Sequence, residues 1–126
     1  MLVFPEIDKK QTKKKAHQVL SAYLRLRRIA GTKRVTIDRQ TEEIEDRNSR
    51  KFLAIQEVSN IEIAVEQLES ETAQLLKDKY MNAYYTTNIA IYMDLHMSES
   101  KFYRLLDHAL ICFAEVYEDG ALLVEQ

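Results

Sequence analysis

Scarcity of glycine and proline limits this chain more than any other feature of its sequence. Its 126 residues include only Gly31, Gly120 and Pro5 of these two types. Tight β-hairpins depend on glycine at turn positions where φ is positive, so a chain with so little of it has few places to build them. We therefore predict an all-α protein, with enough residues for one helical core.

The cysteine content and the N-terminal residues indicate the cellular compartment of the protein. The single cysteine, Cys112, excludes an intramolecular disulfide and any metal site with several cysteine ligands. Pro5, Glu6 and Asp8 stand where a signal peptide would need an apolar run, and no apolar stretch is long enough to cross a bilayer. We expect a cytoplasmic protein with no membrane partner.

Charge is distributed unevenly along the chain. The formal net charge is only −2, yet residues 1–34 hold ten lysines and arginines against two acids. The remaining residues hold eight bases against eighteen acids. This split favours a basic element that meets a polyanion beside an acidic body. The alternative is that the two parts neutralise each other inside one fold or one dimer.

Apolar residues at spacings of three and four predict a first helix over residues 9–30, which ends at Gly31. The helix dipole disfavours lysines at the N-terminal end, so we predict that the five lysines there contact the phosphate backbone of DNA. The apolar stripe must be covered by the body or by the same helix of a second subunit. DNA sites of such proteins often consist of two symmetric half-sites, which favours a homodimer. The lysines are Lys9, Lys10, Lys13, Lys14 and Lys15, and the stripe is Ala16, Val19, Leu20, Tyr23, Leu26, Ile29 and Ala30.

Three segments follow from these patterns: a basic N-terminal helix in residues 1–31, a polar linker in 32–48 and a helical domain in 49–126. Four further helices are expected in the domain. The apolar tail, residues 122–124, packs on the body or helps an oligomer form. The expected helices are 49–68 with the stripe Phe52, Ile55, Val58, Ile61, Val65 and Leu68; one capped by Ser70 with Ala73, Leu76 and Tyr80 inside; a short one capped by Thr86 or Thr87 that ends near Leu95; and one from Ser98 to about Tyr117.

The stretch IYMDLHMSESKFYR, residues 91–104, has the register of a helix-turn-helix, which we place at residues 86–117. Ile91 and Leu95 lie one helical turn apart, and Met97 fills the turn. Two positions depart from the common pattern: Tyr92 replaces a small residue at the helix crossing, and His96 replaces the glycine that takes a positive φ. The predicted inner side of the second helix is Phe102, Leu105, Ala109, Cys112, Phe113 and Val116.

The outer side of that second helix is the predicted DNA-reading surface. Ser98 caps the helix, and the N–H groups at this end can also meet a phosphate. The predicted DNA-binding residues are Ser98, Glu99, Ser100, Lys101, Tyr103, Arg104 and His108.

The chain begins with the stretch FPEIDKKQTKKKAHQVLSAYLRLRRIAG, continues through a polar linker and has MSESKFYRLLDHALICFAEVY near its end. These stretches, in this order, resemble the ArpU family of late-gene transcriptional regulators, found in phages and prophages of Gram-positive bacteria. The resemblance implies that the C-terminal part of the chain is similar to region 4 of bacterial sigma factors, with a recognition helix over residues 98–114. It also implies a DNA-binding activator of packaging, structural or lysis genes in the cytoplasm of a bacterial host. The family usually has glycine in the turn where this chain has His96.

Enzyme chemistry is not expected. The three histidines are far apart in sequence, without paired ligand spacing, and no glycine-rich phosphate loop is present, so we expect neither a cofactor nor a metal. Residues 86–117 carry two bases against four acids, a weak electrostatic anchor for double-stranded DNA. Two other functions therefore stay open. One is a helical adaptor that binds RNA polymerase or a phage or satellite regulatory protein without reading bases. The other is a packaging factor indifferent to sequence.

Overall fold

The computed structural model describes residues 5–31, 50–85 and 87–126, and this part of the chain is helical, as predicted. Its one β-type pairing is an isolated bridge between Ile7 and Glu125. The predicted linker over residues 32–48 and the Thr86 alternative for a helix cap lie outside the described residues. The helices are α1 (Lys9–Ser21), α2 (Tyr23–Ala30), α4 (Arg50–Glu66), α5 (Ser70–Leu76), the π-helix η2 (Lys77–Met81), α6 (Asn88–Asp94), α7 (Glu99–Val116) and the 3₁₀ helix η3 (Tyr117–Gly120).

The predicted first helix is present as α1 and α2, which are separated only by Ala22. Asp8 caps α1, because its side chain accepts a hydrogen bond from the Gln11 N–H at 3.0 Å. Gly31 ends α2 with φ of 77°, a conformation that a side chain would strain. The sequence thus identified both ends of this element, and only the irregularity at Ala22 was missed.

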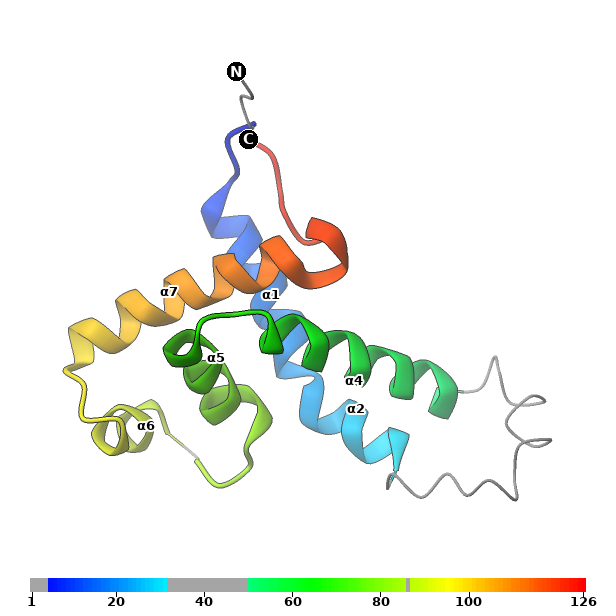
Figure 1. The fold of residues 1–126 in the computed structure, drawn as a ribbon, viewed down its shortest axis with the longest axis horizontal. Coiled ribbons are helices and arrows are strands. Elements are labelled where there is room, and N and C mark those ends of the chain that lie inside the picture. The colour runs from blue at the N-terminus through cyan, green and yellow to red at the C-terminus, as the bar shows by residue number, and fades with distance from the viewer. Residues whose placement is uncertain (1–4, 32–49, 86) are drawn as a thin grey trace.

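One hydrophobic core joins the N-terminal helices to the rest of the described chain. Figure 1 shows α1 crossing α7 and α2 running beside α4, and both pairs are in contact. Leu20 and Tyr23 are fully buried in the same cluster as Ile61, Phe102 and Phe113. The apolar stripe of the first helix is therefore covered largely by its own chain. A second subunit is not needed to cover it.

The chain end also packs on the body. The Asp8 N–H donates to the carbonyl oxygen of Val124 at 2.7 Å, and the Val124 N–H donates to the Thr12 hydroxyl at 3.0 Å. Leu122 and Leu123 are partly buried against the core. Of the two roles that the sequence left open for this tail, packing on the body is the one observed.

Tyrosine hydroxyls join helices that are distant in sequence. Tyr23 on α2 donates to Glu62 on α4 at 2.7 Å, and Tyr117 donates to Glu57, also on α4. Burial, together with Glu57, raises the pKa of Tyr117 above its ordinary value, so this phenol stays protonated and able to donate. These bonds hold α4 to the helices on both of its sides.

The predicted inner side of α7 is confirmed in part. Phe102, Ala109 and Phe113 are buried, and Leu105 and Val116 are partly buried against the core, but the buried Leu106, Leu110 and Ala114 were not predicted. The cause is that α1 and α5 both pack on α7, which widens its buried arc and rotates it from the predicted stripe. The other errors are Ile55, which is 37% exposed, and Ser70, which is the first residue of α5 while Glu69 occupies the cap position.

No helix in the described ranges has both the length and the apolar character needed to cross a membrane.

Phe102→Ala should destabilise the fold by about 3–5 kcal/mol, because the side chain is fully buried and its loss leaves a cavity. The matched control is Tyr84→Ala, which truncates a ring that is 77% exposed and should cost less than about 1 kcal/mol. Denaturant unfolding monitored by circular dichroism measures both changes. Equal losses for the two variants would contradict the burial of Phe102.

Candidate nucleic-acid interface

Side-chain caps define both helices of the candidate reading unit, which consists of α6, the turn at residues 95–98 and α7. Thr87 caps α6 by accepting from the Ala90 N–H at 3.2 Å. Ser98 caps α7 by accepting from the Lys101 N–H at 3.1 Å. Both caps were predicted from the sequence, since Ser and Thr at these positions satisfy the first free N–H groups of a helix.

The turn closes as a Schellman motif with His96 in the left-handed position. The Met97 N–H donates to the Tyr92 carbonyl at 2.9 Å, and the His96 N–H donates to the Met93 carbonyl at 3.2 Å. These are the two bonds of the motif, whose left-handed residue is usually glycine. His96 has φ of 55°, so a histidine takes the left-handed conformation at the turn position where glycine is usual.

Tyr92 has room at the helix crossing. Its ring centroid lies 5.6 Å from that of Phe102, with the rings tilted by 51°. Tyr92, Met97 and Leu95 are partly buried against the core, and Ile91 is buried in it. The large side chain thus packs between α6 and α7, where a small residue is more usual.

Every predicted DNA-binding residue of α7 and its cap is exposed to solvent. On α7 itself, Ser100, Lys101, Arg104 and His108 lie on the side away from Phe102 and Leu106, whereas the Tyr103 ring contacts Phe102 and its hydroxyl is next to Asn88 of α6. The exposed set is Ser98, Glu99, Ser100, Lys101, Tyr103, Arg104 and His108.

The two cations on this surface differ. The Lys101 Nζ lies 3.6 Å from a carboxylate oxygen of Glu71 on α5, and both side chains are more than half exposed. Arg104 forms no ion pair or hydrogen bond within the described part of the chain. Arg104 is consequently the cation of α7 that is available without breaking an existing contact.

A hydrogen-bonded chain fixes Tyr103 to α6. The Lys79 Nζ donates to the Asn88 side-chain oxygen at 2.8 Å, and the Asn88 amide nitrogen donates to the Tyr103 hydroxyl at 3.4 Å. Burial lowers the pKa of Lys79. Neither Lys79 nor Asn88 was predicted, because η2 and α7 come together only in the folded chain. The one sequence signal was an amide residue next to the Thr87 cap.

The predicted phosphate-contacting lysines all lie on α1, and four of them are exposed: Lys9, Lys10, Lys14 and Lys15. The fifth is Lys13, whose Nζ lies 3.3 Å from Asp107 on α7. Part of the charge split along the chain is therefore neutralised inside the fold. The remaining lysines stay accessible at the end of α1.

His108 and Cys112 lie one helical turn apart on α7, with 3.3 Å between the histidine Nε2 and the cysteine Sγ. Burial, helped by Glu115 and Glu69, raises the pKa of the Cys112 thiol, so it stays protonated at neutral pH. Across the described ranges, no group of three or more His, Cys, Asp or Glu side chains is placed to hold a metal ion.

The chain matches no protein-family model and no solved structure. It is similar to a protein of Streptococcus phage O1205 named "Putative autolysin regulatory protein ArpU". The two sequences are 29% identical over 138 residues, which cover 99% of this chain and 100% of that protein. The similarity supports the ArpU-like character inferred from the sequence and agrees with a regulatory role. The name of that protein refers neither to DNA nor to sigma factors.

His96→Gly should stabilise the protein by up to about 1 kcal/mol, because glycine takes the left-handed conformation without strain. His96→Val should destabilise it by about 1–2 kcal/mol, since a β-branched residue tolerates that conformation poorly. Thermal and denaturant unfolding measure both. The side chain is exposed, so a loss of stability with glycine would mean that the backbone at His96 differs from the structure described.

Proposed function

We propose that this chain is a phage or prophage regulator that binds double-stranded DNA and activates late genes for packaging, structural or lysis proteins. The observation that carries the proposal is the α6–turn–α7 unit, capped at both helices and closed at His96, with an exposed polar face that includes Arg104, which has no partner among the described residues. Similarity to a phage protein named as a regulator supports the same role.

Sequence reading is assigned to the first turns of α7 in the major groove. The Ser98 hydroxyl satisfies the Lys101 N–H, so the N–H groups of Glu99 and Ser100 remain for a phosphate oxygen. Arg104 is suited to guanine, because its guanidinium donates two parallel hydrogen bonds to the major-groove edge of that base. Tyr103, held by Asn88, lies beside it.

We assign most of the affinity for DNA to the lysines of α1. Phosphate neutralisation supplies most of the attraction between proteins and DNA, and α7 offers little of it. The exposed lysines of α1 supply the missing charge, and the pair between Lys13 and Asp107 places that helix directly against α7. On this assignment α7 specifies the site and α1 holds the backbone.

A second candidate is a helical adaptor that binds RNA polymerase or a phage or satellite regulatory protein without reading bases. The observation that favours it is the outer face of α6, where Ile89 is 61% exposed and Met93 65% exposed, with no base among the residues of that helix. No DNA binding even at low salt would favour this candidate, whereas DNA binding without sequence preference would favour the packaging factor.

Arg104→Ala should weaken binding to the cognate site by roughly 1–3 kcal/mol, while binding to random DNA changes much less. Fluorescence anisotropy with labelled duplexes gives the ratio of the two affinities. Arg28→Ala on α2 is the charge-matched control, because it removes an equally exposed cation away from α7 and should leave that ratio unchanged. An unaltered ratio for Arg104→Ala would reject α7 as the reading helix.

Changing Lys9, Lys10, Lys14 and Lys15 to glutamine should reduce the affinity for cognate and random DNA by a similar factor. The slope of log K against log salt should flatten by about 0.9 for each lysine that contacts a phosphate. Lys13→Gln is the control, since Lys13 already pairs with Asp107 and its loss should change the slope least. A slope that the fourfold variant leaves unchanged would assign this end of α1 to a protein partner.

A further inference from the structure

The outer stripe of α4 is a surface that the DNA-binding proposal does not use. It consists of Leu53, Gln56, Asn60 and Ile63, which follow one another at spacings of three, four and three. Leu53 is 57% exposed and Ile63 is 56% exposed, although 30% of the chain's residues are charged and none of these four is. Gln56 is also exposed and Asn60 is half-buried. An uncharged and largely exposed stripe at this spacing is typical of a helix that pairs with another helix.

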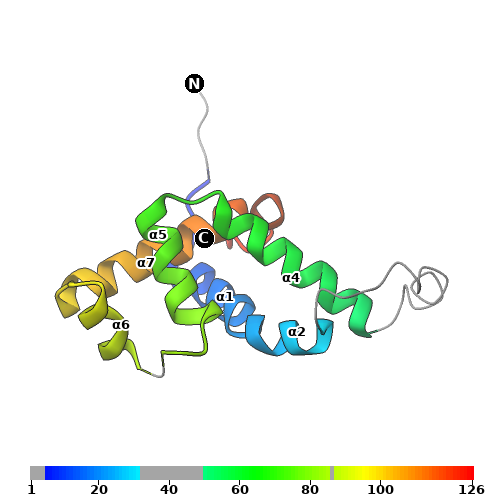
Figure 2. The same ribbon diagram turned by 60° about the horizontal axis from the view of Figure 1, so that its bottom comes forward.

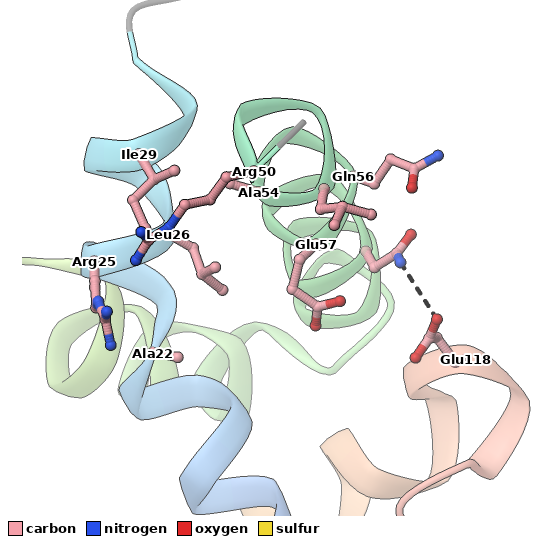
Figure 3. A pocket seen from close by; sticks show the side chains of 11 residues that line it. Ala22, Arg25, Leu26, Ile29, Arg50, Ala54, Gln56, Glu57 and Glu118 are labelled. Carbon is pink, nitrogen blue, oxygen red and sulfur yellow. Dashed lines mark hydrogen bonds between the residues drawn. The ribbon is translucent and has the colours of Figure 1, made fainter. Parts of the chain in front are cut away.

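The opposite side of α4 already belongs to the core, through Ala54, Ile61 and Val65. Figure 3 shows Gln56 pointing away from α2, the neighbour that α4 packs against. The Asn60 amide nitrogen donates to Glu118 at 3.4 Å, which leaves the Asn60 side-chain oxygen without a partner among the described residues. The stripe is thus available to a second molecule while the fold stays intact.

We propose that the outer stripe of α4 binds the same stripe of a second copy of this chain, with the two helices antiparallel. A two-fold axis level with residue 58 puts Leu53 of each copy level with Ile63 of the other, and Gln56 level with Asn60. Apolar side chains then meet apolar ones, and amides meet amides. A two-fold interface requires this kind of self-complementarity, in which residue i contacts residue j and j contacts i. In an antiparallel coiled coil, the first core position of the repeat on one helix lies level with the second core position on the other helix, and the same is true of these pairs.

Charge along α4 favours the same direction of pairing. The helix begins with Arg50 and Lys51 and ends with Glu66, so antiparallel pairing brings the basic start of one copy toward the acidic end of the other. Parallel pairing would place like charges together. The antiparallel arrangement also opposes the two helix dipoles.

Pairing through α4 leaves the DNA-reading unit of each copy free. Figures 1 and 2 show α4 and α6 on opposite sides of the molecule. The stripe spans eleven residues, about 15 Å of helix, which is small for a protein interface. We therefore expect a dissociation constant in the micromolar range, which a DNA site with two half-sites would strengthen through proximity.

Sedimentation equilibrium of the full chain without DNA, from about 1 to 200 µM, tests the proposal independently of any DNA binding. The expected result is a reversible monomer–dimer equilibrium, weakened at least tenfold by Leu53→Glu. The matched control is Met93→Glu on α6, which buries no charge in the fold because Met93 is 65% exposed, and which should leave dimerisation unchanged. A monomer at every concentration, or a dimer insensitive to Leu53→Glu, would overturn the proposal.

The register has its own test. Leu53→Lys combined with Ile63→Glu puts opposite charges level across the antiparallel pair and should retain dimerisation at low salt. Leu53→Glu combined with Ile63→Glu puts like charges there and should abolish it. Circular dichroism confirms that each variant folds, as both side chains are exposed. Equal dimerisation by the two double variants would exclude the antiparallel register.

Discussion

The packing of α1 across α7 is the contact on which the rest of the structure depends. It buries Leu20 in the same core as Phe102. An ion pair between Lys13 of α1 and Asp107 of α7 joins the two helices beside this core. Because of this contact, the basic start of the chain lies beside the helix proposed to read DNA and is not a separate arm. The tail returns to α1 through Val124 and Thr12, so both ends of the chain support the same junction.

Electrostatics limits what α7 can do without α1. Four acids, Asp94 on α6 and Glu99, Asp107 and Glu115 on α7, outnumber the two cations of α7. One of those cations, Lys101, is already near Glu71. Asp94 has a further contact, since it accepts a hydrogen bond from Tyr85 and thereby raises the pKa of that phenol to about 12. A DNA-binding face of this kind depends on charge supplied from elsewhere in the fold. The exposed lysines of α1 are one described source, because that helix packs on α7.

Local features of the fold could be predicted from the sequence, whereas features set by three-dimensional neighbours could not. The Ser98 cap, the stop at Gly31 and the α6 cap, which the sequence narrowed to Thr86 or Thr87, depend on a few adjacent residues. The sequence also showed that His96 stands at the turn position where glycine is usual, and its φ is positive. The buried arc of α7 was misjudged, because α1 and α5 both contact it and periodicity alone does not reveal two neighbours. In the candidate site, the exposed residues of α7 could be named in advance. The chain from Lys79 through Asn88 to Tyr103 could not, since it joins three separate elements.

The central claim is that this chain recognises a defined DNA sequence near late genes. DNase I protection of the DNA upstream of the packaging, structural and lysis genes in the genome that carries this gene tests it most directly. At about 50 mM salt, where phosphate contacts are strongest, the account predicts one discrete protected site that persists in the presence of excess random DNA. Uniform protection along the fragment, or no protection under these conditions, would contradict it.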